Sequence, residues 1–117
     1  MMFDVRAGRP QEVEAVRACV LSAFEHYVER IGTPPAPMLL NFQEEIAADH
    51  VWVVEEQGRV LGALVQFETP EGFYVDTVAV IPAKQGTGVG RSLLEFAEQE
   101  ARRRGFDSVY LLSLIHI

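Results

Sequence analysis

Apolar residues recur along this chain with two different spacings, and these spacings predict its helices and strands. From Pro10 to about Glu29 they return every three or four residues, as on a helix with one buried face. A weaker pattern of the same kind predicts a second helix over Met38 to Ala48. Gly32 and the three prolines that follow it separate the two helices, because proline cannot continue a helix.

Shorter apolar runs predict strands at residues 3–7, 51–55, 60–68, 74–80 and 107–111. Short turns join the three in the middle, which predicts an antiparallel meander. A helix predicted from Val89 to Arg104 separates the last two strands, so we expect these two to be parallel. The predicted fold class is α/β (α+β): a mixed, mostly antiparallel sheet with helices on both faces, in the order strand, helix, helix, strand, strand, strand, helix, strand.

The predicted last helix has clear end signals. Gly105 stands where a C-terminal cap is expected, and the arginines at 102–104 suit the negative end of the helix dipole. We interpret this charge run as a solvated helix end rather than a phosphate contact. The inner stripe of the helix is predicted as Val89, Leu93, Ala97 and Ala101, with Phe96 beside it.

The composition is that of one folded domain. Of 117 residues, 49% are apolar, which is enough for a single core. The formal charge is −7, since 10 basic residues oppose 17 acidic ones. This charge argues against partners such as nucleic acid or an anionic membrane and is compatible with a cationic amine. No run approaches ~18 apolar residues and no basic-then-apolar leader is present, so we expect a cytoplasmic protein. Cys19 is the single cysteine, which we interpret as a small interior residue, and we predict no metal site.

The strongest chemical signal follows strand 74–80. Pro82 ends the strand, three glycines follow at alternate positions, and a helix begins near Val89. This order directs backbone N–H groups and the positive end of a helix dipole at one place, which favours a bound phosphate. The glycines are Gly86, Gly88 and Gly90.

Three glycine motifs compete for this loop. In a P-loop the first glycine would fall on Gln85 and the lysine on Arg91. A dinucleotide fingerprint needs G-x-G-x-x-G where this chain has G-x-G-x-G, and its acidic residue should end the next strand, which Asp107 instead precedes. The pattern [QR]-x-x-G-x-[GA] fits in register with Gln85, Gly88 and Gly90. With it, the phrase VDTVAVIPAKQGTGVGRSLLEFAEQEARRRG resembles the central motif of the GNAT superfamily of N-acetyltransferases.

The resemblance implies acetyl-coenzyme A as cosubstrate and a primary amine as acceptor, with direct attack in a ternary complex. The glycine turn would hold the pyrophosphate and Gln85 would fix the turn. The pantetheine arm would run beside the end of strand 74–80, where the family's fourth and fifth strands splay apart and a backbone N–H stabilises the oxyanion. The predicted coenzyme-binding residues are Val78, Ala79, Val80, Gln85, Gly86, Thr87, Gly88, Val89, Gly90, Arg91 and Ser92.

Asp76 is the candidate general base, because the attacking amine must lose a proton. Family members often carry an acidic residue at this place, and in a regular strand residues 76, 78 and 80 would share one face. The alternative is an aspartate that simply reaches solvent. For the acceptor, Tyr27, Met38 and Phe42 either line its site or are ordinary core residues.

The end of the chain departs from the family pattern. GNAT proteins usually continue after the last strand with a helix carrying an Asn and a Tyr, the Tyr protonating the leaving thiolate, and then with further strands. Residues 112–117 instead resemble the translation of an adaptor used in sequencing libraries, with a genuine apolar strand end as the alternative. We therefore expect a partial GNAT domain over residues 1–111 and an artefactual tail over 112–117, with low stability and little turnover. A non-catalytic acyl-coenzyme A-binding or sensory module is the alternative function, and a homodimer stays an open alternative.

Overall fold

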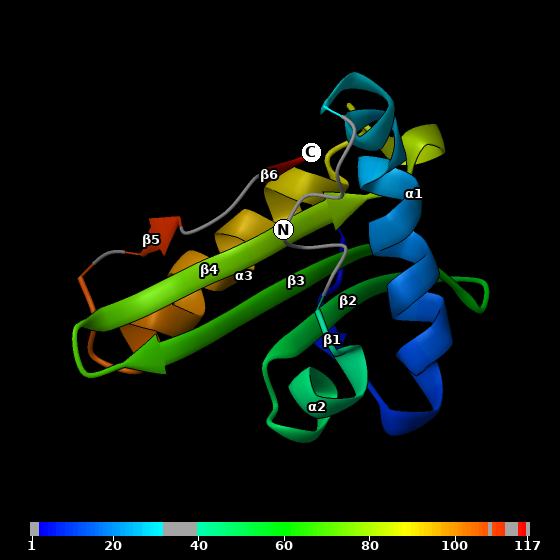
Figure 1. The fold of residues 1–117 in the computed structure, drawn as a ribbon. Helices are drawn as coiled ribbons and strands as arrows, with labels where there is room; N and C mark the ends of the chain where they lie inside the picture. The colour runs from blue at the N-terminus through cyan, green and yellow to red at the C-terminus, as the bar shows by residue number, and fades with distance from the viewer. Residues whose placement is uncertain (1–2, 32–39, 108, 112–114, 117) are drawn as a thin grey trace.

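The computed structural model describes residues 3–31, 40–107, 109–111 and 115–116. Its sheet has the strand order β1-β2-β3-β4-β5, and β6 also pairs with β4 (Figure 1). Neighbours from β1 to β4 are antiparallel, whereas β5 and β6 both run parallel to β4. This confirms the predicted mixed, mostly antiparallel sheet. The strands are β1 (Arg6–Ala7), β2 (Val51–Glu56), β3 (Arg59–Thr69), β4 (Gly72–Val80), β5 (Tyr110–Leu111) and β6 (Ile115–His116).

Helices cover both faces of the sheet, as predicted. Helix α3 (Val89–Arg103) lies on one face and α1 (Val13–Ile31) on the other, with α2 (Phe42–Ala47) packed against α1 (Figure 1). A 3₁₀ turn, η1 (Pro10–Glu12), leads into α1, with Pro10 at its start. Among the described residues, no helix is both long enough and apolar enough to cross a membrane.

The second helix is shorter than the pattern predicted. It begins after Asn41, whose side chain accepts a 3.1 Å hydrogen bond from the Glu44 N–H and so caps the helix. It ends at Ala47, and Asp49 then takes a left-handed conformation with φ 61°. Met38, the predicted start, lies outside the described residues. The two edge strands are also shorter than predicted, because β1 begins only at Arg6 and β5 only at Tyr110.

Helix α3 has the predicted inner stripe and C-terminal cap. Val89, Leu93, Ala97 and Ala101 are all buried, and Phe96 packs beside them on the core. Gly105 takes a left-handed φ of 91°. Its N–H donates to the Arg102 carbonyl, and the Phe106 N–H donates to the Ala101 carbonyl at 2.8 Å. This pair of hydrogen bonds is a Schellman motif. It requires a positive φ at residue 105, which glycine adopts without steric strain.

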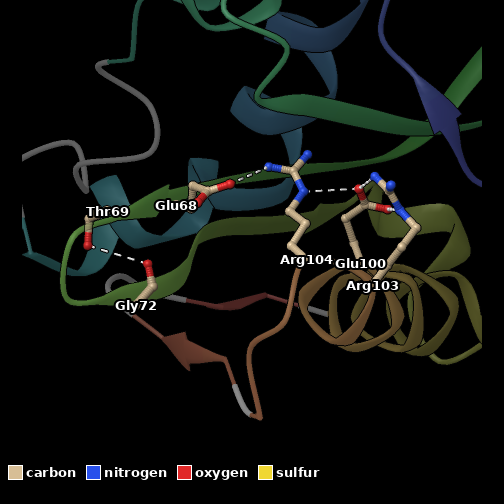
Figure 2. Close-up of polar contacts among 6 residues, drawn as sticks. All are labelled: Glu68, Thr69, Gly72, Glu100, Arg103 and Arg104. Atoms are coloured by element: carbon tan, nitrogen blue, oxygen red, sulfur yellow. Dashed lines mark hydrogen bonds and ion pairs between the residues drawn. The ribbon is translucent and has the colours of Figure 1, made fainter.

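The arginines at the end of α3 pair with local carboxylates. Arg104 bonds Glu100 at 3.1 Å and Glu68 of β3 at 3.4 Å, and Arg103 also bonds Glu100 (Figure 2). The hydrogen bond from Arg103 is the main cause that lowers the pKa of Glu100. This end of α3 is opposite the glycine loop, so the structure fits a solvated helix end. Figure 2 also shows the β3–β4 turn, where the Thr69 hydroxyl donates to the Gly72 carbonyl at 3.4 Å.

Strand β4 contains a β-bulge at Asp76. On β3, Val65 pairs with Thr77, while the next residue, Gln66, pairs with Val75. Asp76 therefore has no partner on β3, and the alternation of β4 changes phase at this point. The change of phase interrupts the regular strand that we assumed in placing residues 76, 78 and 80 on one face.

Contacts with α3 show this change of phase directly. Before the bulge, the Phe73 ring centroid lies 5.7 Å from that of Phe106. The guanidinium of Arg104, at the end of α3, lies over the Phe73 ring, 5.4 Å from its centroid. After the bulge, Val80 pairs with Gly62, which faces Val89 of α3. Residues 73 and 80 are an odd number apart and would face opposite sides of a regular strand. Both lie on the α3 side because Asp76 adds one residue.

Candidate functional site

The loop between β4 and α3 is shaped by two glycines in left-handed conformations. After the short turn η3 (Pro82–Lys84), Gly86 has φ 80° and Gly88 has φ 104°. A side chain at either position would strain the backbone. Gly88 is the N-cap of α3 and provides no side-chain cap. The first N–H groups of α3 are therefore available to an anion from outside the helix.

Two side chains stabilise this loop by donating hydrogen bonds to nearby backbone carbonyls. The Gln85 amide donates a 3.1 Å hydrogen bond to the carbonyl of Val80, the last residue of β4. The Thr87 hydroxyl donates to the Lys84 carbonyl at 2.6 Å. The turn is thus tied to the end of the strand before it. This is the arrangement that the resemblance implied for Gln85, whereas Thr87 uses its hydroxyl within the turn.

A surface cavity of about 350 Å³ opens at the loop, lined by Gly86, Gly88, Gly90 and Arg91. Three of its four lining residues are glycines, so backbone atoms form much of its wall. The Arg91 side chain is 85% exposed, and its Nε lies 3.2 Å from a carboxylate oxygen of Glu95. A cation beside helical N–H groups is a suitable setting for a phosphate.

The side chains of the other predicted coenzyme residues are buried or make hydrogen bonds within the protein. The Ser92 hydroxyl is buried and accepts a 3.1 Å hydrogen bond from the Phe3 N–H, which ties the N-terminal segment to α3. Val89 is fully buried against Gly62. Val78, Ala79 and Val80 are also fully buried. Because the side chains of Val78, Ala79, Val80 and Val89 are buried, these residues can contact a ligand at this surface only through their backbone groups.

The outer edge of β4 next to the loop is occupied by the chain itself. β5 pairs with β4 at Tyr74 and Val75, and β6 pairs with it at Val78 and Ala79. We expected strands four and five to splay apart here. In the described residues, β5 pairs with only two residues of β4, and β6 pairs with two more on the same edge.

Asp76 lies at the bulge, half-buried, four residues before the end of β4. Its Oδ2 accepts a hydrogen bond of 2.9 Å from the Thr77 hydroxyl. Sequence analysis missed Thr77 as its partner. The signal was available, since an Asp-Thr pair inside an apolar strand places two hydrogen-bonding side chains together.

The acceptor candidates are only partly covered by the structure. Phe42 is fully buried in the core, so for this residue the core interpretation is correct. The side chain of Tyr27 and the whole of Met38 lie outside the described residues.

Cys19 is not a nucleophile at neutral pH. Its thiol is buried beside the Ala79 carbonyl, at 4.0 Å, and burial raises the pKa of Cys19 to about 12. The reactive form of cysteine is the thiolate, and at this pKa the thiolate is scarce. Within the described part of the chain, no group of three or more His, Cys, Asp or Glu residues could hold a metal ion.

Comparison with known families identifies the class of protein. Residues 16–115 match the model described as the acetyltransferase (GNAT) family. The chain therefore belongs to the GNAT family of acetyltransferases. A search of curated proteins by sequence found no match.

Solved structures share this fold. Rv2747 from Mycobacterium tuberculosis, in complex with CoA and NLQ, is 26% identical with a TM-score of 0.71, over 95% of this chain and 64% of that one. A GNAT family acetyltransferase from Brucella melitensis, in complex with acetyl-CoA, is 25% identical with a TM-score of 0.67, over 94% and 75%. N-acetylglutamate synthase from Neisseria gonorrhoeae, with coenzyme A and N-acetyl-glutamate, is similar in fold, with 20% identity and a TM-score of 0.70 over 94% of this chain and 25% of that one.

Proposed function

We propose that this chain binds acetyl-coenzyme A at the loop from Gly86 to Ser92 and transfers its acetyl group to a primary amine. The observation that carries the proposal is the loop itself. Two left-handed glycines, an uncapped helix N-terminus and an exposed arginine surround one cavity at the end of β4. The pyrophosphate of the coenzyme is an anion of the kind that such a cavity binds.

The acetyl thioester would then lie along β4, towards Asp76. Asp76 is the only ionisable side chain of β4 apart from Tyr74. Its carboxylate oxygens would accept the proton of the incoming ammonium group, since only the neutral amine can attack. The net charge of −7 favours approach by a cationic acceptor.

In the chemical step, the amine nitrogen attacks the acetyl carbon and the carbonyl oxygen becomes an oxyanion. A backbone N–H near Val78–Val80 would stabilise that charge. The carbon–sulfur bond then breaks, and coenzyme A leaves as a thiol once its sulfur takes a proton. This proton balances the one that the attacking nitrogen loses as it becomes an amide. An acetylated cysteine is not needed, in keeping with the buried, protonated Cys19 thiol.

Steady-state kinetics tests the proposal. Release of coenzyme A would be followed with a thiol reagent while acetyl-coenzyme A and a panel of primary amines are both varied. Direct attack in a ternary complex predicts double-reciprocal lines that intersect, whereas an acetyl-enzyme would give parallel lines. Binding of acetyl-coenzyme A without turnover of any amine would contradict the proposed acetyl transfer and support the alternative, a non-catalytic acyl-coenzyme A-binding module.

A further inference from the structure

The outer edge of β4 is shared by two short strands. The opposite edge of β4 pairs with β3 over nearly its whole length. On the outer edge, Tyr74 pairs with Tyr110 and Val75 with Leu111, and then Val78 pairs with Ile115 and Ala79 with His116. Figure 1 shows β6 beside the end of β4 that leads into the glycine loop.

β6 is a separate pairing rather than a continuation of β5. The offset between partners is 110 − 74 = 36 for β5 and 115 − 78 = 37 for β6, so the chain gains one residue relative to β4. The change of register falls beside the bulge at Asp76. A parallel pairing of two residues makes few hydrogen bonds, and each adds little net stability because water replaces it in the open state. β6 can therefore leave β4 without unfolding the rest of the sheet.

The coenzyme needs the same edge if the proposed function is right. Its arm carries two amides between the pyrophosphate and the thioester, and amides are satisfied by pairing with a strand edge. With the pyrophosphate on the loop that follows Val80, an arm that reaches Asp76 spans four residues of β4, roughly 13 Å. Since β3 holds the other edge, the arm would meet the backbone of Val78 and Ala79, where β6 now pairs.

We propose that β6 and the pantetheine arm of acetyl-coenzyme A compete for the edge of β4 at Val78 and Ala79. This inference rests on the proposed coenzyme site. The coenzyme then binds only those molecules whose β6 has left, and the apparent dissociation constant rises by the inverse of that fraction. If roughly nine molecules in ten hold β6 in place, its release tightens binding by about tenfold.

Ile115 offers a matched pair of variants. Ile115→Pro removes one of the two backbone N–H groups of β6 and fixes φ, whereas Ile115→Val keeps the backbone and a β-branched side chain. Calorimetry would measure the affinity for acetyl-coenzyme A, which has the arm, and for 3′-phospho-ADP, which has the adenosine and phosphates of the coenzyme without the arm. We expect Ile115→Pro to bind acetyl-coenzyme A about tenfold tighter than wild type. Ile115→Val should match wild type, and 3′-phospho-ADP should bind all three equally.

Hydrogen exchange on the wild-type chain gives a second measurement that needs no variant. Saturating acetyl-coenzyme A should speed exchange in the peptide that contains residues 115–116, and 3′-phospho-ADP should not. Equal affinity of wild type and Ile115→Pro for acetyl-coenzyme A, or slower exchange with it, overturns the competition. If 3′-phospho-ADP binds in that case, the loop site stands. Failure of both ligands to bind every protein overturns the proposed function and this inference with it.

Discussion

The Asp76 carboxylate accepts a 2.9 Å hydrogen bond from the hydroxyl of Thr77, its neighbour in sequence. Consecutive side chains in a regular strand point to opposite faces and do not meet in this way. They meet here because Asp76 is the extra residue of a β-bulge, between Val75 and Thr77. Thr77 is fully buried, while Asp76 is half-buried. A fixed partner beneath the carboxylate is a suitable support for a group that has to accept a proton.

Asp76→Asn should lower kcat by about 10²–10⁴-fold, because the amide cannot accept the amine proton. The affinity for acetyl-coenzyme A should not change, since the loop is untouched. The control is Asp107→Asn, which removes an exposed carboxylate beyond α3. If a folded Asp76→Asn protein kept its kcat, Asp76 would not be the general base but an aspartate that simply reaches solvent.

Gly62→Ala should destabilise the fold by about 1–3 kcal/mol through overpacking. A Cβ on Gly62 would lie 2.6 Å from Val89 Cγ1, 3.0 Å from Leu93 Cδ1 and 3.2 Å from the Ala79 carbonyl oxygen. Adding Val89→Ala removes the closest of these atoms. Urea unfolding should therefore show the double variant more stable than the sum of the two single changes. Strict additivity would mean that the close approach of β3 and α3 does not limit this position.

Glu12→Gln should lower the free energy of unfolding by about 1–2 kcal/mol at pH 7. Arg6 bonds both carboxylate oxygens of Glu12, at 2.9 and 2.7 Å, and the hydrogen bond from Arg6 is the main cause that holds the pKa of Glu12 below its ordinary value of 4.5. A lowered pKa in the folded state contributes stability above the ordinary pKa, and this is lost as the pH falls through the folded value. Unfolding curves at pH 7 and near pH 3 should show the gap between the proteins shrink in acid. A gap that does not depend on pH would contradict this pairing.

Gln66→Met should stabilise the protein by about 1–2 kcal/mol. Gln66 is fully buried in β3, and within the described part of the chain neither its Nε2 nor its Oε1 has a hydrogen-bond partner. Methionine fills a similar volume without desolvating an amide. The expected readout is a rise in melting temperature of several degrees. A fall would show that the amide has a partner, such as a buried water, that this change removes.

The conformation of the glycine loop could be predicted from sequence because its determinants are local. Pro82 ends a strand, glycines supply the left-handed positions, and α3 follows with its own inner stripe and Gly105 cap. Each of these is fixed within a few residues. The orientation of β5 also followed from chain length alone, since a helix separates it from β4.

The bulge and the β6 pairing could not be predicted in the same way. The bulge depends on which residue of β3 faces Thr77, and register is a property of two strands. Because of it, the regular alternation that we assumed for residues 76, 78 and 80 is interrupted at Asp76. The β6 pairing depends on which segment reaches the outer edge of β4, and the sequence around Val78 and Ala79 gives no local signal of that partner.

Calorimetric titration of acetyl-coenzyme A into the wild-type chain and into Gly88→Trp is the direct test of a coenzyme site at the glycine loop. Gly88 has φ 104° at the N-cap of α3, so a tryptophan there strains the turn and fills the cavity that would hold the pyrophosphate. Gly105→Ala controls for strain, since it places a side chain at φ 91° in open space at the other end of α3. We expect binding to wild type and to Gly105→Ala, and none to folded Gly88→Trp. Equal binding by all three would contradict a coenzyme site at this loop.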